Sequence, residues 1–382
     1  MPRPPGRAAS AERIPASVYW SKLPEGEAPP ARVVPLNVGD TWLPPVPGAR
    51  MEDLAEATYP DLHRYAHPRG VPELVEALVA KLRARNAIEC GPESVLVAAG
   101  ATGALACAIG AIADPGDEVL ILAPFWPLIR GIARAFRAEP VEVPFFDRVG
   151  TVEEALAAVR ARLSPRSVAL YVSTPSNPTG RVLPAGWLEA LAALARRENL
   201  WLLSDEVYED YVYRGEHVSL ARFAPERTFS IFSFSKAYGM AGHRVGYLAG
   251  PPEAVVAAEK IGTHTFYAAP TAAQIAALRA LEVGDAWLEK ARRAYREAGE
   301  DAASALGLPP PEGSTFLFLD LRGRLGARGI DGFLEECLRR GVALARGSSC
   351  GEAYAGFARL SFTAAPPGDV AEAVRRIAPL VR

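Results

Sequence analysis

Apolar positions follow two alternating spacings from about residue 71 to 263. Short apolar runs, typical of buried strands, are separated by stretches in which apolar residues recur every three or four positions, as on amphipathic helices. The pattern predicts a mostly parallel seven-stranded sheet covered by helices on both faces. The predicted strands are 95–98, 118–122, 140–144, 167–172, 200–204, 228–233 and 244–249, and the predicted helices are 71–86, 101–113, 126–136, 151–162 and 184–197.

The C-terminal third has a different pattern. After helices expected at 269–282 and 285–306, a proline-rich segment leads into the alternating run 316–319, which indicates a strand with one buried face. The sequence is therefore expected to form an N-terminal arm (1–32), a large domain (43–285) and a smaller α+β domain built from 33–42 and 286–382. The further elements of the small domain are helices at 330–340 and 368–380 and strands at 342–345 and 357–362.

Composition excludes several classes of protein. The formal charge of the 382 residues is -2, which argues against binding to nucleic acid or to an anionic membrane surface. The apolar runs are too short to span a bilayer. Four scattered cysteines favour a reduced, cytoplasmic setting, and residues 1–32, rich in Pro, Ala and Arg, are expected to be partly disordered near their start.

His63 and His67 are spaced to share one face of a helix, which is the one hint of a metal site. Pro68 follows directly and no third ligand stands nearby, so we expect a loop or a helix end and no metal.

The segment 233–246 carries the most informative chemistry. A single lysine, Lys236, stands among small and apolar residues, three positions after Ser233 and eight before Arg244. A lysine that loses its proton can form a Schiff base with an aldehyde, and a serine and an arginine can hold a phosphate. The phosphorylated aldehyde that fits both is pyridoxal phosphate (PLP). A Ser-x-x-Lys pattern also occurs in acyl-serine enzymes such as penicillin-binding proteins, but their Lys-Thr-Gly segment is absent here.

Polar residues follow three other predicted strands. Ala101 and Thr102 lie in a small-residue turn before a helix, where backbone N–H groups could approach a phosphate, although a tight turn alone would look the same. Asp205 could face a pyridine nitrogen or simply cap a turn, and Tyr208 follows three positions later. Asn177 lies between two prolines in a rigid turn. Ligands in such folds bind outside the carboxyl ends of the strands.

Taken together, three segments resemble the successive signatures of class I aminotransferases, which are PLP-dependent enzymes of fold type I. They are Asn177-Pro178-Thr179-Gly180, Asp205-Glu206-Val207-Tyr208, and Ser233-Phe234-Ser235-Lys236 followed by Arg244. The order of the three segments and the spacing between them agree with those of the family, and the resemblance extends from about Leu36 to the C-terminus.

The resemblance implies a role for each matching residue. Lys236 would bind the cofactor aldehyde and move the substrate proton, Asp205 would pair with the pyridinium nitrogen, and Tyr208 would contact the ring oxygen. Asn177 would share that contact. The remaining matches are Ala101, Thr102, Ser233 and Arg244 for the phosphate, Trp126 for stacking on the ring, and Gly39 and Arg359 for the substrate carboxylate.

The resemblance also predicts assembly and bears on the substrate. Tyr65 matches a tyrosine that reaches the phosphate of the neighbouring subunit, which implies a homodimer with shared active sites.

Some bacterial aspartate enzymes have a lysine at the position of Thr102, where it binds the distal carboxylate of the substrate. The absence of that lysine here favours neutral or aromatic substrates. Trp42 and Phe125 could line an apolar pocket or belong to the core. The segments around Gly39 and near the C-terminus depart from the family pattern, so relatives cannot supply the side-chain preference.

We therefore expect a PLP-dependent aminotransferase that moves an amino group between an L-amino acid and a 2-oxo acid by ping-pong chemistry. A carbon–sulfur β-lyase on the same scaffold is the alternative, because it would share Lys236, Asp205 and Arg359. A non-enzymatic sensor fused to a DNA-binding domain is disfavoured, since residues 1–32 are too short and proline-rich for a winged helix.

Overall fold

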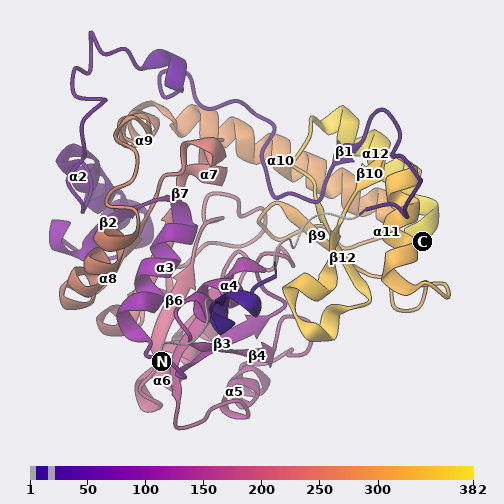
Figure 1. Cartoon of the computed structure of the whole chain (residues 1–382), viewed down its shortest axis with the longest axis horizontal. Helices are drawn as coiled ribbons and strands as arrows, with labels where there is room; N and C mark the ends of the chain where they lie inside the picture. The colour runs from indigo at the N-terminus through magenta and orange to yellow at the C-terminus, as the bar shows by residue number, and fades with distance from the viewer. Residues whose placement is uncertain (1–5, 16–21) are drawn as a thin grey trace.

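The computed structural model describes residues 6–15 and 22–382, and its main element is a seven-stranded sheet (Figure 1). The strands are β2 (Val95–Ala98), β3 (Glu118–Ala123), β4 (Glu139–Pro144), β5 (Ser167–Ser173), β6 (Trp201–Asp205), β7 (Thr228–Ser233) and β8 (Gly246–Ala249). Their order is β2-β8-β7-β6-β5-β3-β4, with β8 antiparallel to both neighbours and the other pairs parallel. The predicted mostly parallel sheet is confirmed.

Helices cover both faces of this sheet, as predicted. Neighbouring strand residues such as Leu170 and Tyr171 point to opposite faces and belong to different hydrophobic clusters. One cluster joins the sheet to α3 (Gly100–Ile112), α4 (Leu128–Ala135) and α8 (Pro252–Thr265), and the other joins it to α5 (Val152–Arg160) and α6 (Ala185–Arg197). The prediction missed α8, in which Gly262, Thr263 and Thr265 weaken the helical pattern.

Three further helices follow the predicted order. They are α2 (Pro72–Lys81), extended by a π-helical turn at Leu82–Asn86, then α9 (Thr271–Val283) and α10 (Asp285–Leu306). The long α10 runs from beside α9 toward the C-terminal part of the fold, where it packs on α12 (Pro367–Val381) (Figure 1).

The C-terminal third forms the smaller α+β unit that the sequence predicts. Strands β9 (Phe316–Asp320), β12 (Phe357–Ser361) and β11 (Ala345–Arg346) make an antiparallel sheet, with α11 (Gly329–Arg339) and α12 beside it. Strand β1 (Val34–Pro35) pairs with β10 (Val342–Ala343), so the segment after the arm does lie against this unit. The single strand expected over 342–345 is wrong, because the chain divides at Leu344 and its two halves pair in different sheets.

The described part of the N-terminal arm touches both parts of the fold. A short helix α1 (Ala9–Glu12) lies beside α4, and the Arg13 guanidinium bonds both carboxylate oxygens of Glu139 at 2.7 and 2.6 Å. Further along, Arg339 donates to Glu27 at 2.8 Å. Residues 1–5 and 16–21, on which the expected partial disorder of the arm bears, lie outside the described residues. Within the described ranges, no helix has the length and apolar character of a membrane span.

Candidate active site

A cavity of about 190 Å³ opens at the carboxyl ends of β5, β6 and β7, where ligands bind in sheets of this kind. Every residue that the sequence analysis assigns to the site lines this cavity, except Tyr65. The predicted residues that line it are Gly39, Ala101, Thr102, Trp126, Asn177, Asp205, Tyr208, Ser233, Lys236, Arg244 and Arg359. Segments far apart in the sequence therefore meet at one edge of the sheet.

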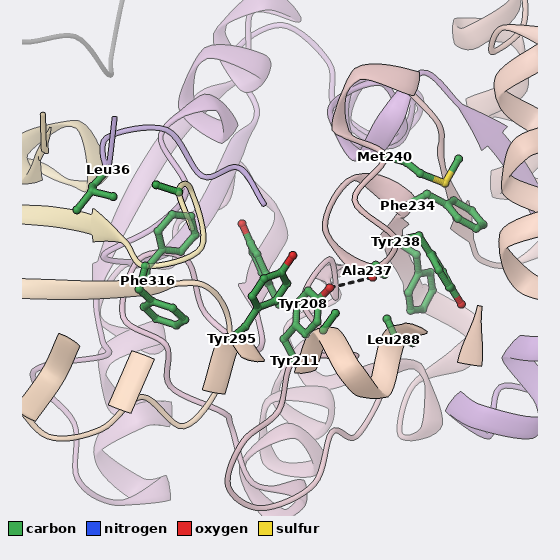
Figure 2. Close-up of a cluster of buried hydrophobic side chains, with 14 of the residues drawn as sticks. Leu36, Tyr208, Tyr211, Phe234, Ala237, Tyr238, Met240, Leu288, Tyr295 and Phe316 are labelled. Atoms are coloured by element: carbon green, nitrogen blue, oxygen red, sulfur yellow. Dashed lines mark hydrogen bonds between the residues drawn. The ribbon is translucent and has the colours of Figure 1, made fainter. Parts of the chain in front are cut away.

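Lys236 lies on α7 (Phe234–Ala237), a single turn directly after β7. Ser233 caps this turn, because its hydroxyl accepts a hydrogen bond from the backbone N–H of Ser235 at 3.1 Å. From outside the turn, the Tyr211 hydroxyl donates to the carbonyl of Lys236 at 2.7 Å and to that of Ala237 at 2.8 Å (Figure 2). The backbone that carries the lysine is thus held by groups on both sides.

Burial lowers the pKa of Lys236 to about 8, and the charges of Arg359 and Arg244 act in the same direction, while Asp40 opposes them. The Nζ atom donates a hydrogen bond to the carbonyl of Gly39. The uncharged amine is therefore far more populated near neutral pH than it is for an ordinary lysine. An uncharged amine is the form that attacks an aldehyde.

Asp205 ends β6 and is 5% exposed. Its Oδ2 accepts a hydrogen bond from the Tyr171 hydroxyl at 2.5 Å, and its Oδ1 accepts one from the backbone N–H of Val207 at 3.4 Å. Burial raises the pKa of Asp205 to about 6; these hydrogen bonds oppose the shift, and the charge of Glu206 adds to it. A buried carboxylate of this kind is stabilised by a cationic N–H donor, which a pyridinium ring provides.

Arg359 lies on the central strand β12 and is 1% exposed, so it is not a solvated arginine on an edge strand. Its Nη1 donates to Oδ1 of Asn177 and its Nη2 donates to the carbonyl of Asn37, both at 3.0 Å. The amide of Asn177 in turn donates to the Tyr208 hydroxyl at 3.4 Å. The guanidinium is thereby oriented within the cavity wall, as binding of a carboxylate requires.

Phe316 supports this arginine and was not predicted as a site residue. Its ring lies 4.4 Å from Cζ of Arg359 and packs edge-on against Tyr208 at 5.8 Å (Figure 2). A Cβ at Gly39 would come within 2.5 Å of Cζ of Phe316, so glycine is the residue that fits there. The alternating run around Phe316 predicted a strand but gave no sign of this contact.

The other end of the cavity is built to receive an anion. Helix α3 begins at Gly100, whose φ is 72°, and the N-terminal residues Ala101 and Thr102 line the cavity. A Cβ at Gly100 would lie 2.6 Å from Nη2 of Arg244, so only glycine lets the guanidinium approach the helix start. Arg244 is fixed by a 2.8 Å hydrogen bond to the carbonyl of Ala241. A helix N-terminus beside a guanidinium suits a phosphate.

The residues present therefore fit PLP. The cavity combines an amine of lowered pKa at Lys236, a buried carboxylate at Asp205, and a phosphate cradle at Arg244 and the start of α3. Arg359 is a further cation at the wall, available to a substrate carboxylate.

Three aromatic residues that the sequence analysis names lie outside this cavity. Tyr65 is 87% exposed and packs against Tyr267 with ring centroids 4.9 Å apart, away from the cavity of its own chain. Phe125 is fully buried and Trp42 packs against a hydrophobic cluster, so neither lines the cavity. Of the two alternatives that the sequence leaves open for them, core packing is the one that the structure shows. Trp126, by contrast, does line the cavity.

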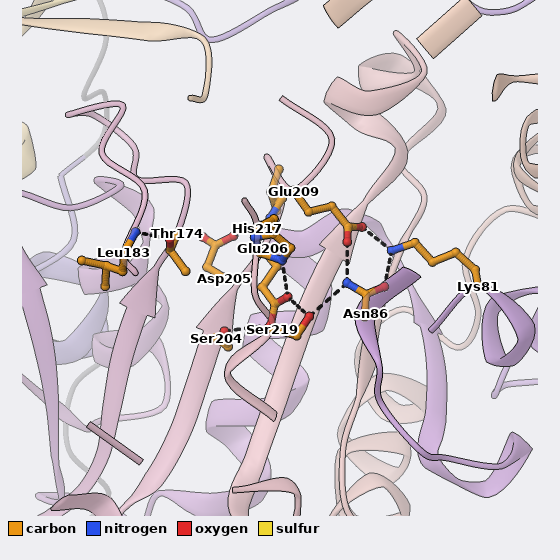
Figure 3. A network of polar contacts seen from close by, with 11 residues as sticks. Lys81, Asn86, Thr174, Leu183, Ser204, Asp205, Glu206, Glu209, His217 and Ser219 are labelled. Atoms are coloured by element: carbon orange, nitrogen blue, oxygen red, sulfur yellow. Dashed lines mark hydrogen bonds and ion pairs between the residues drawn. The ribbon is translucent and has the colours of Figure 1, made fainter. Parts of the chain in front are cut away.

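A buried polar network lies directly behind Asp205 (Figure 3). Glu206 is fully buried and accepts hydrogen bonds from Ser204 at 2.9 Å, Ser219 at 2.5 Å and His217 at 2.8 Å. Burial raises the pKa of Glu206, but these bonds and the charge of His217 outweigh burial and hold it below its ordinary value. Beyond Ser219, Asn86, Glu209 and Lys81 continue the network. It fixes the backbone that follows Asp205.

The comparisons with known proteins agree with this site. The family model described as aminotransferase class I and II matches residues 31–377. The chain belongs to this family.

Relatives and solved structures show the same family. The chain is 40% identical to the aspartate/prephenate aminotransferase of Thermus thermophilus over 265 residues, which cover 67% of this chain and 69% of that protein. It is 34% identical to an arginine–pyruvate transaminase of Pseudomonas aeruginosa over 373 residues, covering 94% and 91%. The structure of Thermus thermophilus aspartate aminotransferase with maleate superposes with a TM-score of 0.82 at 35% identity, covering 91% and 92%.

This aminotransferase uses PLP, adopts fold type I and transfers amino groups between amino acids and 2-oxo acids. The predicted fold, cofactor and reaction are thereby confirmed. These relatives are named as aminotransferases, which gives no support to the β-lyase alternative.

Proposed function

We propose that this aminotransferase acts on L-amino acids with neutral or aromatic side chains, with Lys236 as the group that moves the substrate proton. The observation that carries the proposal is the meeting of Lys236, Asp205 and Arg359 around one cavity, with the lysine pKa lowered to about 8. Asn177 and Tyr208 would contact the ring oxygen, and Trp126 would stack on the ring.

When bound, PLP supplies an aldehyde that condenses with amines and a ring that withdraws electrons from the reacting carbon. Lys236 would hold the aldehyde between turnovers, and its Nζ, when released, would accept the proton from the substrate α-carbon. Arg359 binds the α-carboxylate through its planar guanidinium and so orients the substrate. Asp205 keeps the ring nitrogen protonated. General acid–base catalysis of this kind contributes roughly 10²–10⁴-fold.

The cations of the cavity wall support the choice of substrate. Among its described lining residues, the cations are Lys236, Arg244 and Arg359, and each already has a partner in the cofactor or the α-carboxylate. Thr102 stands where some aspartate enzymes have a lysine. Val38 and Phe316 add apolar surface. A second substrate carboxylate would therefore lack a cationic partner among the described residues that line this cavity. The relatives are named for aspartate, prephenate and arginine, so their names do not agree on one side chain.

The experiment is a donor panel read by absorption. Purified holoenzyme is mixed with phenylalanine, leucine, aspartate or arginine in turn, and the loss of the cofactor's visible band is followed together with 2-oxo acid release. Faster conversion by phenylalanine and leucine than by aspartate and arginine is expected. A preference for aspartate or arginine would contradict the proposed substrate class and leave the aminotransferase assignment intact.

We further propose that the enzyme is a cytoplasmic homodimer in which Tyr65 completes the active site of the partner subunit. The support for the dimer is the position of Tyr65, which projects from the surface beside Tyr267 and outside the cavity of its own chain.

We also propose that the chain divides into a large domain over 43–285 and a small domain formed by 33–42 and 286–382. The support for the division is the pairing of β1 with β10.

A further inference from the structure

Tyr171 is a buried tyrosine that the reaction scheme above does not use. It lies within β5, its side chain is fully buried, and its hydroxyl donates a hydrogen bond to Oδ2 of Asp205 at 2.5 Å. The sequence shows only an apolar strand residue here, since an aromatic residue within a buried run is typical of core packing.

The sheet itself determines this contact. Strands β5 and β6 run parallel, with Tyr171 paired to Leu203 and Ser173 paired to Asp205. Paired residues of neighbouring strands project from the same face, and so do residues two positions apart. Tyr171 and Asp205 are therefore diagonal neighbours on one face, within reach of an aromatic side chain. Because both strands are internal to the sheet, the contact is held by rigid elements.

The electrostatic surroundings of Asp205 determine what the hydrogen bond from the Tyr171 hydroxyl does. Asp205 is buried and is followed directly by the buried carboxylate Glu206, and both conditions favour the protonated acid. The Tyr171 hydrogen bond acts in the opposite direction and favours the carboxylate. Burial holds the pKa of Tyr171 well above its ordinary value, and the Asp205 charge adds to this, so the phenol remains a donor at working pH.

We propose that Tyr171 is a positioning residue for transamination, whose hydroxyl holds Asp205 as the carboxylate so that the proton shared with the cofactor stays on the pyridine nitrogen. The inference rests on the proposed role of Asp205. A donor to Oδ2 lowers the basicity of the carboxylate, and a less basic carboxylate leaves the shared proton on the ring. A protonated ring withdraws electrons more strongly from the reacting carbon. Without the hydroxyl, the proton shifts toward Asp205.

The test replaces Tyr171 by phenylalanine, which keeps the ring that packs in the core and removes only the hydroxyl. Wild type and Tyr171→Phe are loaded with PLP carrying ¹⁵N in its pyridine ring, and the nitrogen signal is recorded by NMR over a range of pH. The signal of Tyr171→Phe is expected to move toward that of unprotonated pyridine. The rate of the first half-reaction is expected to fall roughly 10- to 100-fold, the size of a hydrogen bond to a charged group.

Tyr354→Phe is the matched control. The Tyr354 hydroxyl is also buried and also donates to an aspartate, Asp147, at 2.6 Å, but neither residue lines the cavity. Its nitrogen signal should equal that of wild type. An unchanged signal in folded Tyr171→Phe, or an equal shift in Tyr354→Phe, would overturn the proposal.

Asp205→Asn separates this inference from the role on which it rests. If Asp205→Asn leaves the nitrogen signal unchanged, the pairing of Asp205 with the ring fails, and with it the role of Tyr171. If Asp205→Asn shifts the signal and Tyr171→Phe does not, the role of Tyr171 alone is wrong. Should Tyr171→Phe not fold, fluorotyrosine placed at position 171 serves instead. As a stronger donor it should move the nitrogen signal further toward that of protonated pyridine, and no movement in that direction would refute the claim.

Discussion

Arg359 on β12 donates a hydrogen bond to the side-chain oxygen of Asn177 at 3.0 Å, although the two residues are 182 positions apart in the sequence. Asn177 follows β5 of the large sheet, whereas Arg359 belongs to the small antiparallel sheet. The bond therefore ties the proposed carboxylate site to the proposed ring contact. A shift of one sheet relative to the other would disturb both.

Replacing Arg359 by lysine should impair substrate binding. Lysine keeps the charge but loses the planar fork that reaches Asn177 and the carbonyl of Asn37 together. Truncating a buried, hydrogen-bonded charge typically costs about 2–5 kcal/mol, so kcat/KM should fall by roughly 30-fold or more. Steady-state kinetics should show a higher KM for both the amino acid and the 2-oxo acid. Arg375→Lys on the surface of α12 is the control, and equal kinetics in both variants would refute the assignment.

Gly39→Ala should also weaken substrate binding, because it should displace the Phe316 ring that packs against Arg359. The added Cβ would meet Cζ of Phe316 at 2.5 Å and press that ring toward Arg359. Overpacking of this kind costs about 1–3 kcal/mol, which predicts a KM at least several-fold higher. The matched control is Gly368→Ala, where an added Cβ meets nothing within 4 Å. Titration with an unreactive dicarboxylate or monocarboxylate would measure the effect directly, and wild-type affinity in Gly39→Ala would count against the contact.

Hybrid dimers test the proposed role of Tyr65. Lys236→Ala removes the reactive amine from its own cavity, and Tyr65→Phe would weaken phosphate binding in the partner's cavity. A dimer with one chain of each kind contains one cavity in which Lys236 and Tyr65 are both intact. Mixing equal amounts of the two variants through a reversible dissociation step should therefore restore wild-type PLP affinity to one site of each hybrid dimer, which is about a quarter of all sites after random re-association. Sedimentation as a monomer, or no recovery on mixing, would exclude shared sites.

His217→Ala should destabilise the fold in a pH-dependent way. Burial lowers the pKa of His217, but the hydrogen bond to Glu206 outweighs burial and raises this pKa overall. The contribution of protonated His217 to folding stability is therefore complete below its ordinary pKa of 6.5 and is lost as pH rises through its pKa in the folded state. The pKa of Glu206 is lowered, so its contribution is complete above the ordinary value of 4.5 and is lost as pH falls. The difference in stability between wild type and variant should be largest between these two values.

Removing one partner of a buried pair costs about 3–5 kcal/mol, so the loss in the middle of that window should be of this size. Urea unfolding at a series of pH values would measure it, with His264→Ala as the control, because His264 is exposed on α8. A loss that is constant across pH would show that packing, and not the ion pair, accounts for the effect.

The sequence predicted those parts of the site whose chemistry is local. Lys236, Asp205 and Asn177 each follow an apolar strand, and a polar residue at the end of a buried strand faces the place where ligands bind. Arg359 and Gly39 became recognisable only through the family pattern, since their partners are distant in the chain. Phe316 and Tyr171 were missed because an aromatic residue in a strand looks the same whether it packs in the core or supports a site.

The remaining differences have the same physical origin. The sequence leaves Phe125 and Trp42 open between a substrate pocket and the core, because an apolar residue after a strand carries no mark that separates the two. Helix α8 was missed because Gly262, Thr263 and Thr265 have low helix propensity, although its contacts with α3 stabilise it. The division of the expected strand at Leu344 depends on partners from β1 and β12 that no local pattern reveals.

The most direct test of the account is the location of the covalent link to the cofactor. Holoenzyme is reduced with borohydride, digested, and mapped by mass spectrometry, alongside Lys236→Ala and the surface control Lys260→Ala. The account predicts one reduced pyridoxyl label, on the peptide that contains Lys236, present in Lys260→Ala and absent from Lys236→Ala together with turnover. A label on another lysine of the wild-type enzyme, or full turnover by Lys236→Ala, would contradict it.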